Sequence, residues 1–215
     1  MKFETASGLI LRTRLLTETS LIVHWLTPDL GRIATVAKGA RRPRSPFAGK
    51  LDLFYAADFA FSRSRRSDLH TLREVKLQET HHDLREDLVK LQQAAYAANF
   101  LELATETETP LPEIFELMRA FLKRVCGQTP SPQAIFALEL KLLQELGLAP
   151  DLTATRLTPG ARKVSAALLQ ADWQNPARLQ PSLAQTDEVR EWLEGFLLLH
   201  LGRLPRGRAA ALACG

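Results

Sequence analysis

The side chains whose types and spacing most clearly indicate a chemical role are cations in two short segments. The segment 38–50 contains no acid, and its cations are Lys38, Arg41, Arg42, Arg44 and Lys50. A second run follows at Arg63, Arg65 and Arg66, with serines between and around them. Closely packed cations repel one another and lower the stability of the compact state, so a neutralising polyanion is favoured. Arginine matches phosphate and stacks on bases, and serine hydroxyls can donate to phosphate. The pattern favours nucleic-acid binding over a merely solvated loop.

The charge is distributed unevenly along the chain. The 215 residues carry 28 Lys and Arg against 24 Asp and Glu, a formal net charge of +4. Residues 1–75 hold 13 basic and 7 acidic side chains, whereas residues 76–215 hold 15 basic and 17 acidic ones. This asymmetry predicts two parts with different partners.

Residues 1–75 have the hydrophobic pattern of β-strands. Runs rich in β-branched and aromatic residues alternate with period 2, and Pro28 and Gly31 mark a turn. The predicted strands are 7–14, 20–26, 32–39, 51–61 and 69–75. Five short, evenly spaced strands are typical of a small barrel. The basic loop and the aromatic residues suit an OB-fold, which binds oligonucleotides on one face and in its loops. Phe47, at the loop tip, could stack on a base or plug the barrel, and we favour the plug.

From about residue 80 the apolar period changes to that of a helix. The predicted helices are 83–103, 111–126, 133–146, 161–169 and 187–201, with a loop at 150–160. In the first helix one face is expected to be buried, consisting of Leu84, Leu88, Leu91, Ala95, Ala98 and Leu101. We therefore predict an α+β chain in two domains, an OB-fold barrel over residues 1–78 and an all-α domain over residues 79–215.

No motif for catalysis or metal binding stands out. The chain contains no GxxxxGK[ST], GxGxxG or GxSxG sequence. Asp52, Asp58 and Asp68 are too scattered for a two-metal nuclease. Two cysteines without a CxxC pair exclude a disulfide framework and a zinc ribbon. We expect a binding protein without a cofactor or metal, and not an enzyme.

The sequence also predicts where the protein works. The first residues contain an acid and lack the apolar run of a signal peptide. No stretch approaches 18 consecutive apolar residues. We therefore expect a cytoplasmic protein with no membrane partner.

Several segments resemble the bacterial recombination mediator RecO family. The most specific is KGARRPRSPFAGKL at 38–51, followed closely by Phe54. The others are GLILRTR at 8–14, LREDL at 84–88, FALELKLLQELGLAP at 136–150 and FLLLHLGRLPRGR at 196–208. The resemblance runs over most of the chain.

The resemblance implies a fold and a function. Members have an N-terminal OB-fold and a C-terminal helical domain. They bind single- and double-stranded DNA, anneal complementary strands and, with RecR and the single-stranded DNA-binding protein SSB, help to load RecA during DNA repair. A nucleoid-associated location follows. Many members carry a four-cysteine zinc module after the third helix, but residues 148–159 contain no cysteine, so zinc is not expected here.

These implications define the expected site residues. The DNA footprint is expected to comprise Lys38, Arg41, Arg42, Arg44 and Lys50, extended by Arg12, Arg14, Arg63, Arg65 and Arg66. The acidic, apolar-ended tail of SSB needs a hydrophobic pocket with a cation, for which the candidates are Lys123, Arg124 and Lys141. Relatives often place Arg before the third helix, where this chain has Ala134, Ile135 and Phe136. An RNA-binding or ribosome-associated OB-fold protein is the alternative, because a basic barrel alone is compatible with either nucleic acid.

Overall fold

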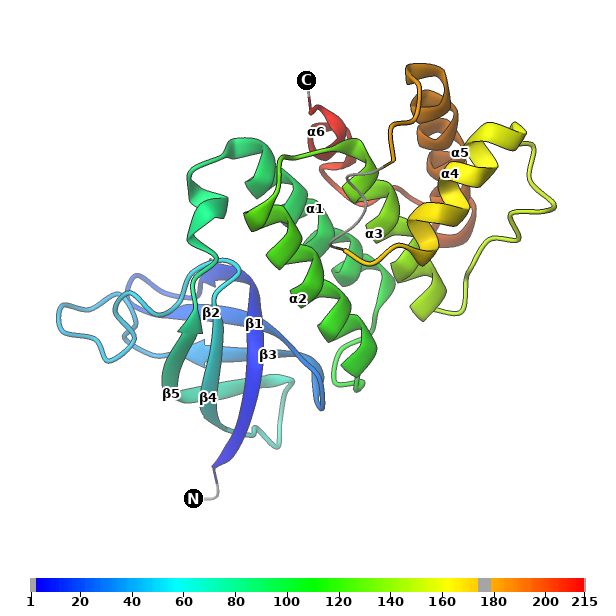
Figure 1. Cartoon of the computed structure of the whole chain (residues 1–215). Helices are drawn as coiled ribbons and strands as arrows, with labels where there is room; N and C mark the ends of the chain where they lie inside the picture. Colours follow the sequence, from blue (N-terminus) through cyan, green and yellow to red (C-terminus); the bar gives the residue numbers. More distant parts are fainter. Residues whose placement is uncertain (1–2, 174–178, 215) are drawn as a thin grey trace. The chain divides into compact units, whose positions relative to one another are not determined.

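The chain is divided into two units. The computed structural model describes residues 3–173 and 179–214 (Figure 1). The first unit, here the barrel unit, comprises residues 1–81 and 106–116, and the second, here the helical unit, comprises residues 82–105 and 117–215. The predicted domain boundary lies after residue 78. The contacts also assign the later segment 106–116 to the barrel unit.

The barrel unit is built on a closed five-stranded barrel, which confirms the predicted fold class. Its strands are β1 (Glu4–Leu15), β2 (Leu21–Thr27), β3 (Gly31–Ala37), β4 (Ala56–Ser62) and β5 (Leu69–Glu79). Around the barrel they follow the order β1-β2-β3-β5-β4. Neighbouring strands are antiparallel except β3 and β5, whose parallel pairing closes the barrel. This is an OB-like arrangement.

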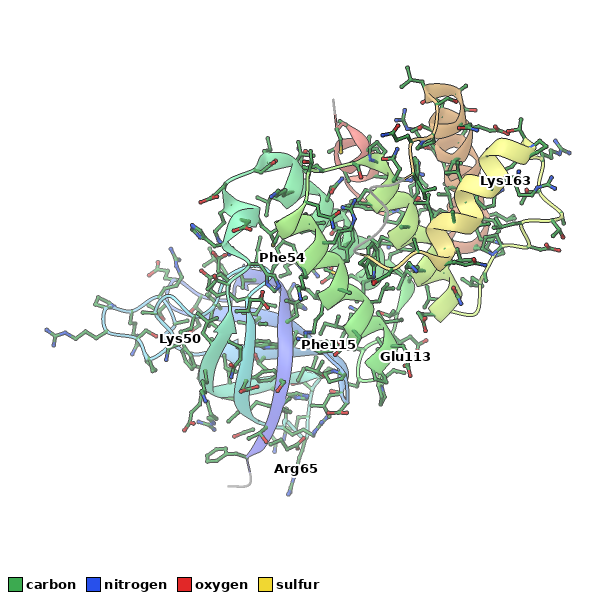
Figure 2. The ribbon with its side chains drawn as sticks, in the orientation of Figure 1. Lys50, Phe54, Arg65, Glu113, Phe115 and Lys163 are labelled. Carbon is green, nitrogen blue, oxygen red and sulfur yellow. The ribbon has the colours of Figure 1, made fainter. Side chains whose placement is uncertain are left out.

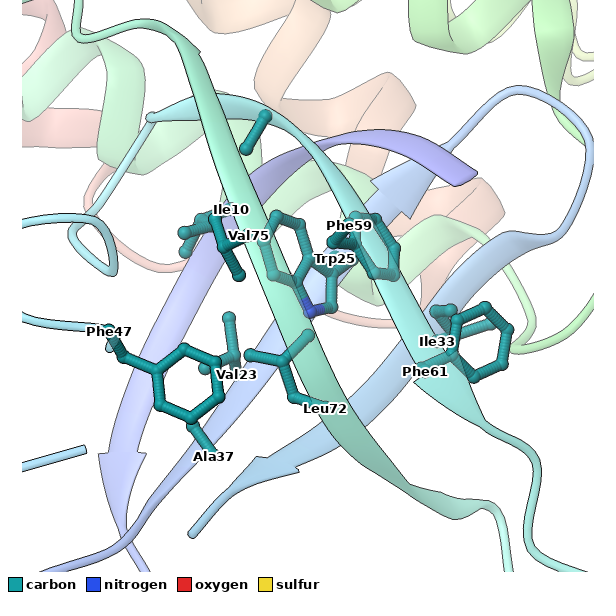
Figure 3. Close-up of a cluster of buried hydrophobic side chains, with 11 residues drawn as sticks. Ile10, Val23, Trp25, Ile33, Ala37, Phe47, Phe59, Phe61, Leu72 and Val75 are labelled. Atoms are coloured by element: carbon teal, nitrogen blue, oxygen red, sulfur yellow. The ribbon is translucent and has the colours of Figure 1, made fainter. Parts of the chain in front are cut away.

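Inward-facing side chains fill the barrel with a continuous apolar core. The Trp25 and Phe59 rings stack with their centroids 4.1 Å apart. The Trp25 indole Nε1 donates to Thr35 Oγ1 at 2.9 Å, so the one polar atom of this buried ring has a partner. Phe47 belongs to the same cluster and is only 6% exposed, and Figure 3 shows its ring among these side chains. The prediction that Phe47 plugs the barrel is confirmed.

The fourth strand begins later than the sequence predicted. The predicted strand 51–61 is wrong at its start, because residues 51–55 form a turn before β4 begins at Ala56. Phe54 has a left-handed backbone with φ of 62° and is buried. Its N–H donates to Ile10 O at 2.8 Å, and Ile10 N–H donates to Tyr55 O at 2.9 Å. The turn therefore ties the end of the basic loop to β1.

A segment distant in sequence completes the barrel unit. Glu108 N–H donates to Arg32 O at 2.9 Å, and Leu111 N–H donates to Pro28 O at 3.0 Å. Both acceptors flank the β2–β3 turn, where Gly31 has φ of 63°. A Cβ on Gly31 would lie 1.7 Å from Thr109 O, so only glycine leaves room for this segment.

The helical unit is built of helices of different lengths. Its elements are the 3-10 helix η1 (His82–Arg85) and the helices α1 (Leu88–Ala104), α2 (Pro112–Gly127), α3 (Pro132–Glu145), α4 (Pro159–Gln170), α5 (Leu183–Leu201) and α6 (Arg208–Leu212). The first five residues of α2 are assigned to the barrel unit.

The single helix predicted over 83–103 is wrong, because the chain breaks between η1 and α1. The Asp87 carboxylate caps α1 by accepting hydrogen bonds from Val89 N–H and Lys90 N–H. This cap turns Leu88 outward at 68% exposure, although Leu84, Ala98 and Leu101 are buried as predicted. A capping side chain at the break satisfies donors that an uninterrupted helix would not leave open.

A buried ion pair ties α6 to the rest of the helical unit. Glu139 on α3 is fully buried, and Arg208 Nε donates to its carboxylate at 2.8 Å. The Tyr96 hydroxyl on α1 donates to the same carboxylate at 2.5 Å. Burial raises the pKa of Glu139, while the hydrogen bonds from Arg208 and Tyr96 oppose that rise. The charge is thus satisfied inside the unit rather than offered at its surface.

The close approach at Gly31 predicts a specific stability loss. Gly31→Ala is expected to lower the free energy of unfolding by about 3 kcal/mol, from left-handed strain plus the steric clash. Gly49→Ala is the matched control, because Gly49 has φ of 71° but open space around its Cβ position. It should cost only the strain, about 1 kcal/mol. Urea unfolding checks this, and equal losses in both variants would contradict the close approach.

Candidate nucleic-acid interface

The basic loop, residues 38–50, is an ordered run of turns. Arg42 N–H donates to Gly39 O, Ser45 N–H to Arg42 O and Ala48 N–H to Ser45 O, all at 3.0–3.1 Å. Lys50 N–H continues the series by donating to Phe47 O at 3.1 Å. Because Phe47 is buried in the barrel, the loop is fixed at both its backbone and its tip.

The predicted cations of the basic loop lie mostly at the surface. Lys38, Arg41, Arg42 and Arg44 are exposed, and Lys50 is half-buried. Within residues 3–173 and 179–214, none of these five forms an ion pair with a carboxylate. Their charge is therefore presented to solvent without local neutralisation, as a phosphate-binding surface requires.

The hairpin between β1 and β2, residues 16–20, holds the basic loop from one side. Arg41 N–H donates to Thr19 O at 3.0 Å, and Gly39 N–H donates to Ser20 Oγ at 3.2 Å. The Arg41 guanidinium also donates to Glu18 O at 3.0 Å. These bonds fix the start of the basic loop against the hairpin, so that the two segments form one surface.

The outer face of β1, β2 and β3 carries further positive charge. Arg12 lies opposite His24 in the β1–β2 ladder. Burial, and then the charges of Arg12, Arg14 and Arg32, lower the pKa of His24 from 6.5 to about 4. Arg12 and Arg14 were predicted for this surface, whereas Arg32 was not. Arg32 occupies an alternating position in the period-2 pattern of β3, and this pattern could have placed it on the outer face.

The second run of cations lies at the other end of the barrel. It occupies the β4–β5 turn, beside the start of β1, as the pairing of Glu4 with Phe61 shows. The hairpin and the basic loop follow the far end of β1, and Figure 2 places Lys50 and Arg65 at these different ends. The structure therefore does not bring the two predicted runs together.

Within this second run the three arginines differ. Arg63 donates to Glu4 at 3.1 Å and to Glu108 at 3.2 Å, and the hydrogen bond with Glu4 raises the pKa of Arg63. Arg65 and Arg66 are exposed. Arg63 thus joins the start of β1 to segment 106–116, while the side chains of Arg65 and Arg66 are exposed to solvent.

The three predicted partner-binding cations of the helical unit lie near Trp173. Lys123 and Arg124 line a pocket of about 520 Å³ together with Asp172 and Trp173. Lys123 is exposed, whereas Arg124 is 5% exposed, donates to Ser131 Oγ and has its pKa lowered by burial. Lys141 donates to Leu169 O at 2.7 Å and lies over the Trp173 ring, 5.9 Å from its centroid. The pocket combines an aromatic wall with the cations Lys123 and Arg124 and with the carboxylate of Asp172.

The described residues contain neither a cluster of metal-ligating side chains nor a membrane-spanning helix. No group of three or more His, Cys, Asp or Glu among them could hold a metal ion. Residues 148–159 contain no cysteine, so they offer no thiol ligand for a four-cysteine zinc module. In the part of the chain that the structure describes, no helix has the length and apolar character needed to cross a bilayer.

Two family models match the chain, one on each side of residue 82. "Recombination protein O N terminal" matches residues 1–81, and "Recombination protein O C terminal" matches residues 85–155. The first match contains the whole barrel and the basic loop. The second contains α1, α2 and α3.

Curated relatives show the same similarity. "DNA repair protein RecO" of Rhodopirellula baltica is 34% identical over 143 residues, 66% of this chain and 53% of the relative. The protein of that name from Bacillus subtilis is 32% identical over 145 residues, 67% of this chain and 56% of the relative. The protein of that name from Idiomarina loihiensis is 37% identical over 134 residues, 62% of this chain and 56% of the relative. The chain therefore spans little more than half the length of these relatives.

The burial of His24 and, after it, the positive charge on the β1–β3 face predict an unusual histidine titration. His24 should titrate near pH 4 in the folded chain, and Arg12→Gln should raise its pKa by removing a nearby positive charge. Because the folded pKa lies below the unfolded value, His24 lowers stability as the pH falls from 6.5 towards 4. Nuclear magnetic resonance of the imidazole measures this, with Lys76→Gln on β5 as the control. A pKa of 6.5 in the folded chain would contradict the positive potential.

Proposed function

The chain belongs to the RecO family, and on this premise we propose that it acts in DNA repair as a recombination mediator. It binds single- and double-stranded DNA, anneals complementary strands and, together with RecR and SSB, helps to load RecA. The observation that carries this proposal is the basic loop, which is anchored by Phe47 and presents cations that have no carboxylate partner among the described residues. A nucleoid-associated location in the cytoplasm follows from binding DNA.

The basic loop supports binding to the phosphate backbone rather than to a particular sequence. Its arginines can grip phosphate oxygens in a bidentate manner, and its lysines act as point charges. Contacts of this kind release counterions, so affinity falls steeply with salt. They also tolerate any base sequence, as a protein acting wherever DNA is damaged requires.

The same surface supports annealing. Two complementary strands repel each other through their phosphates, and a cationic surface that holds both reduces that repulsion. The outer face of β1, β2 and β3 enlarges the positive surface beyond the basic loop through Arg12, Arg14 and Arg32. No bond in the DNA is made or broken, so the proposed activity is binding rather than enzymatic catalysis.

The helical unit supports a different contact, with a protein tail. The SSB tail is acidic and ends in an apolar residue, so its receptor must pair an apolar surface with a cation. The pocket between Lys123 and Trp173 provides both. Lys123 is the exposed cation there, whereas Arg124 is buried in the lining. Lys141 lies over the Trp173 ring and donates to Leu169 O.

Charge reversal in the basic loop tests the DNA proposal. If about five phosphates of a single strand are contacted, the slope of log affinity against log salt is about −3.5, from roughly −0.7 per contact. Arg41→Glu with Arg42→Glu should remove two contacts, reduce the slope to about −2 and weaken binding at least about tenfold. Fluorescence anisotropy of a labelled oligonucleotide measures both quantities.

The matched control reverses two exposed cations of the helical unit, Arg156→Glu with Lys163→Glu (Figure 2). It changes the net charge equally, so a local effect should leave its binding near that of the unaltered chain. Equal affinity and slope in the unaltered chain and the Arg41/Arg42 variant would overturn the DNA assignment. Much tighter binding to RNA of the same sequence would instead favour the RNA-binding alternative.

A second test concerns the protein tail. Lys123→Glu should weaken binding of a labelled peptide with the SSB tail chemistry about tenfold, because it places a like charge at the pocket mouth. Lys163→Glu, on α4 outside the lining of this pocket, is the control and should bind as the unaltered chain does. Titration calorimetry reports both affinities. Identical binding by the two variants would place the tail elsewhere.

A further inference from the structure

An exposed apolar pair lies at the end of β1, beside the basic loop. Leu15 is 63% exposed and Leu16 is 46% exposed. Single exposed leucines are ordinary on protein surfaces. Here two exposed leucines follow one another where β1 enters the hairpin, and the hairpin is hydrogen-bonded to the basic loop. Their position points to an apolar contact with a ligand.

Leu16 forms one wall of a pocket of about 450 Å³ between the hairpin and the basic loop. Val36 supplies a second apolar surface, Thr17 and Ser20 supply hydroxyls, and Lys38 and Arg42 supply positive charge. No acidic residue lines it. This combination of apolar walls with a few convergent polar groups is typical of a small-ligand site.

The pocket is already formed by hydrogen bonds between its two walls. Leu16 N–H donates to Ser20 O at 3.0 Å, closing the hairpin, and Gly39 N–H donates to Ser20 Oγ at 3.2 Å, joining the hairpin to the loop. Gly39 has φ of 67°, and a Cβ there would lie 3.3 Å from Arg42 Cδ. A preformed site of this kind loses little conformational entropy when it is filled.

We propose that this pocket receives one unpaired base of a single strand, with the phosphates on either side of that base held by Lys38 and Arg42. The proposal rests on the proposed DNA-binding function and adds a contact to the base itself. The face of the base lies against Leu16 and Val36, while Thr17 offers a hydroxyl to its edge. Any base has an apolar face, so the contact does not select a sequence.

The pocket makes the surface prefer single strands over duplex. In a duplex each base is stacked and paired, and removing one from the helix costs free energy. Lys38 and Arg42 can touch the phosphates of either form, but only an unpaired base can enter between them without that cost. A mediator that works on strands awaiting their partner would gain from such a preference.

Leu16→Ala tests this inference, with Leu183→Ala as the control, because Leu183 is 85% exposed at the start of α5 in the helical unit. Three labelled probes are compared at fixed salt: a single strand, the same strand with abasic positions, and a duplex. Leu16→Ala should weaken binding of the intact single strand about fivefold and leave the salt slope and duplex binding unchanged. The unaltered chain should bind the intact strand more tightly than the abasic one, and Leu16→Ala should lose that difference.

Other outcomes separate the two proposals. If Leu16→Ala and Leu183→Ala bind every probe equally while Arg41→Glu with Arg42→Glu still weakens binding, the base pocket is overturned and the phosphate surface stands. If the charge reversal also has no effect, the proposed function fails with it. If Leu16→Ala spares the DNA probes but weakens binding of an acidic peptide, the pocket is a peptide site, and the base proposal is overturned.

Discussion

The burial of Phe47 is the interaction on which the proposed DNA-binding surface depends. In a loop that carries five cations and no acid, repulsion between the charges opposes a compact conformation. Phe47 offsets that repulsion by packing into the barrel core with Trp25 and Phe59. Burial of a phenylalanine contributes roughly 2–3 kcal/mol, enough to hold a short loop whose backbone is already closed by successive turns. The cations therefore stay concentrated at one end of the barrel.

Closure of the barrel also separates the two runs of cations in space. The cations after β3 and those in the β4–β5 turn are near in sequence but lie at different ends of β1. At one end they remain without carboxylate partners among the described residues. At the other, Arg63 joins Glu4 and Glu108. The proposed polyanion-binding surface therefore consists of the basic loop, the hairpin 16–20 and the outer face of β1, β2 and β3.

Sequence patterns predicted the barrel, the basic loop and the plugging role of Phe47, because alternation and loop composition are local signals. These patterns did not predict the contacts between distant segments that form when the barrel closes. Glu108 reaches Arg63 from 45 residues away, and no local pattern marks that pairing. Leu88 fitted an apolar helical face, yet the cap at Asp87 starts a new helix and exposes it. The pocket wall at Leu16 likewise depends on two loops meeting, which only the β1–β2–β3 register establishes.

The most direct test of the account is backbone hydrogen exchange with and without a saturating single-stranded oligonucleotide. We predict slower exchange in the basic loop and in the hairpin 16–20, since these segments form the proposed binding surface. We predict little change in the β4–β5 turn or in α4. Protection confined to the β4–β5 turn or to the helical unit, with the basic loop unchanged, would contradict the claim that the Phe47-anchored loop is the DNA-binding surface.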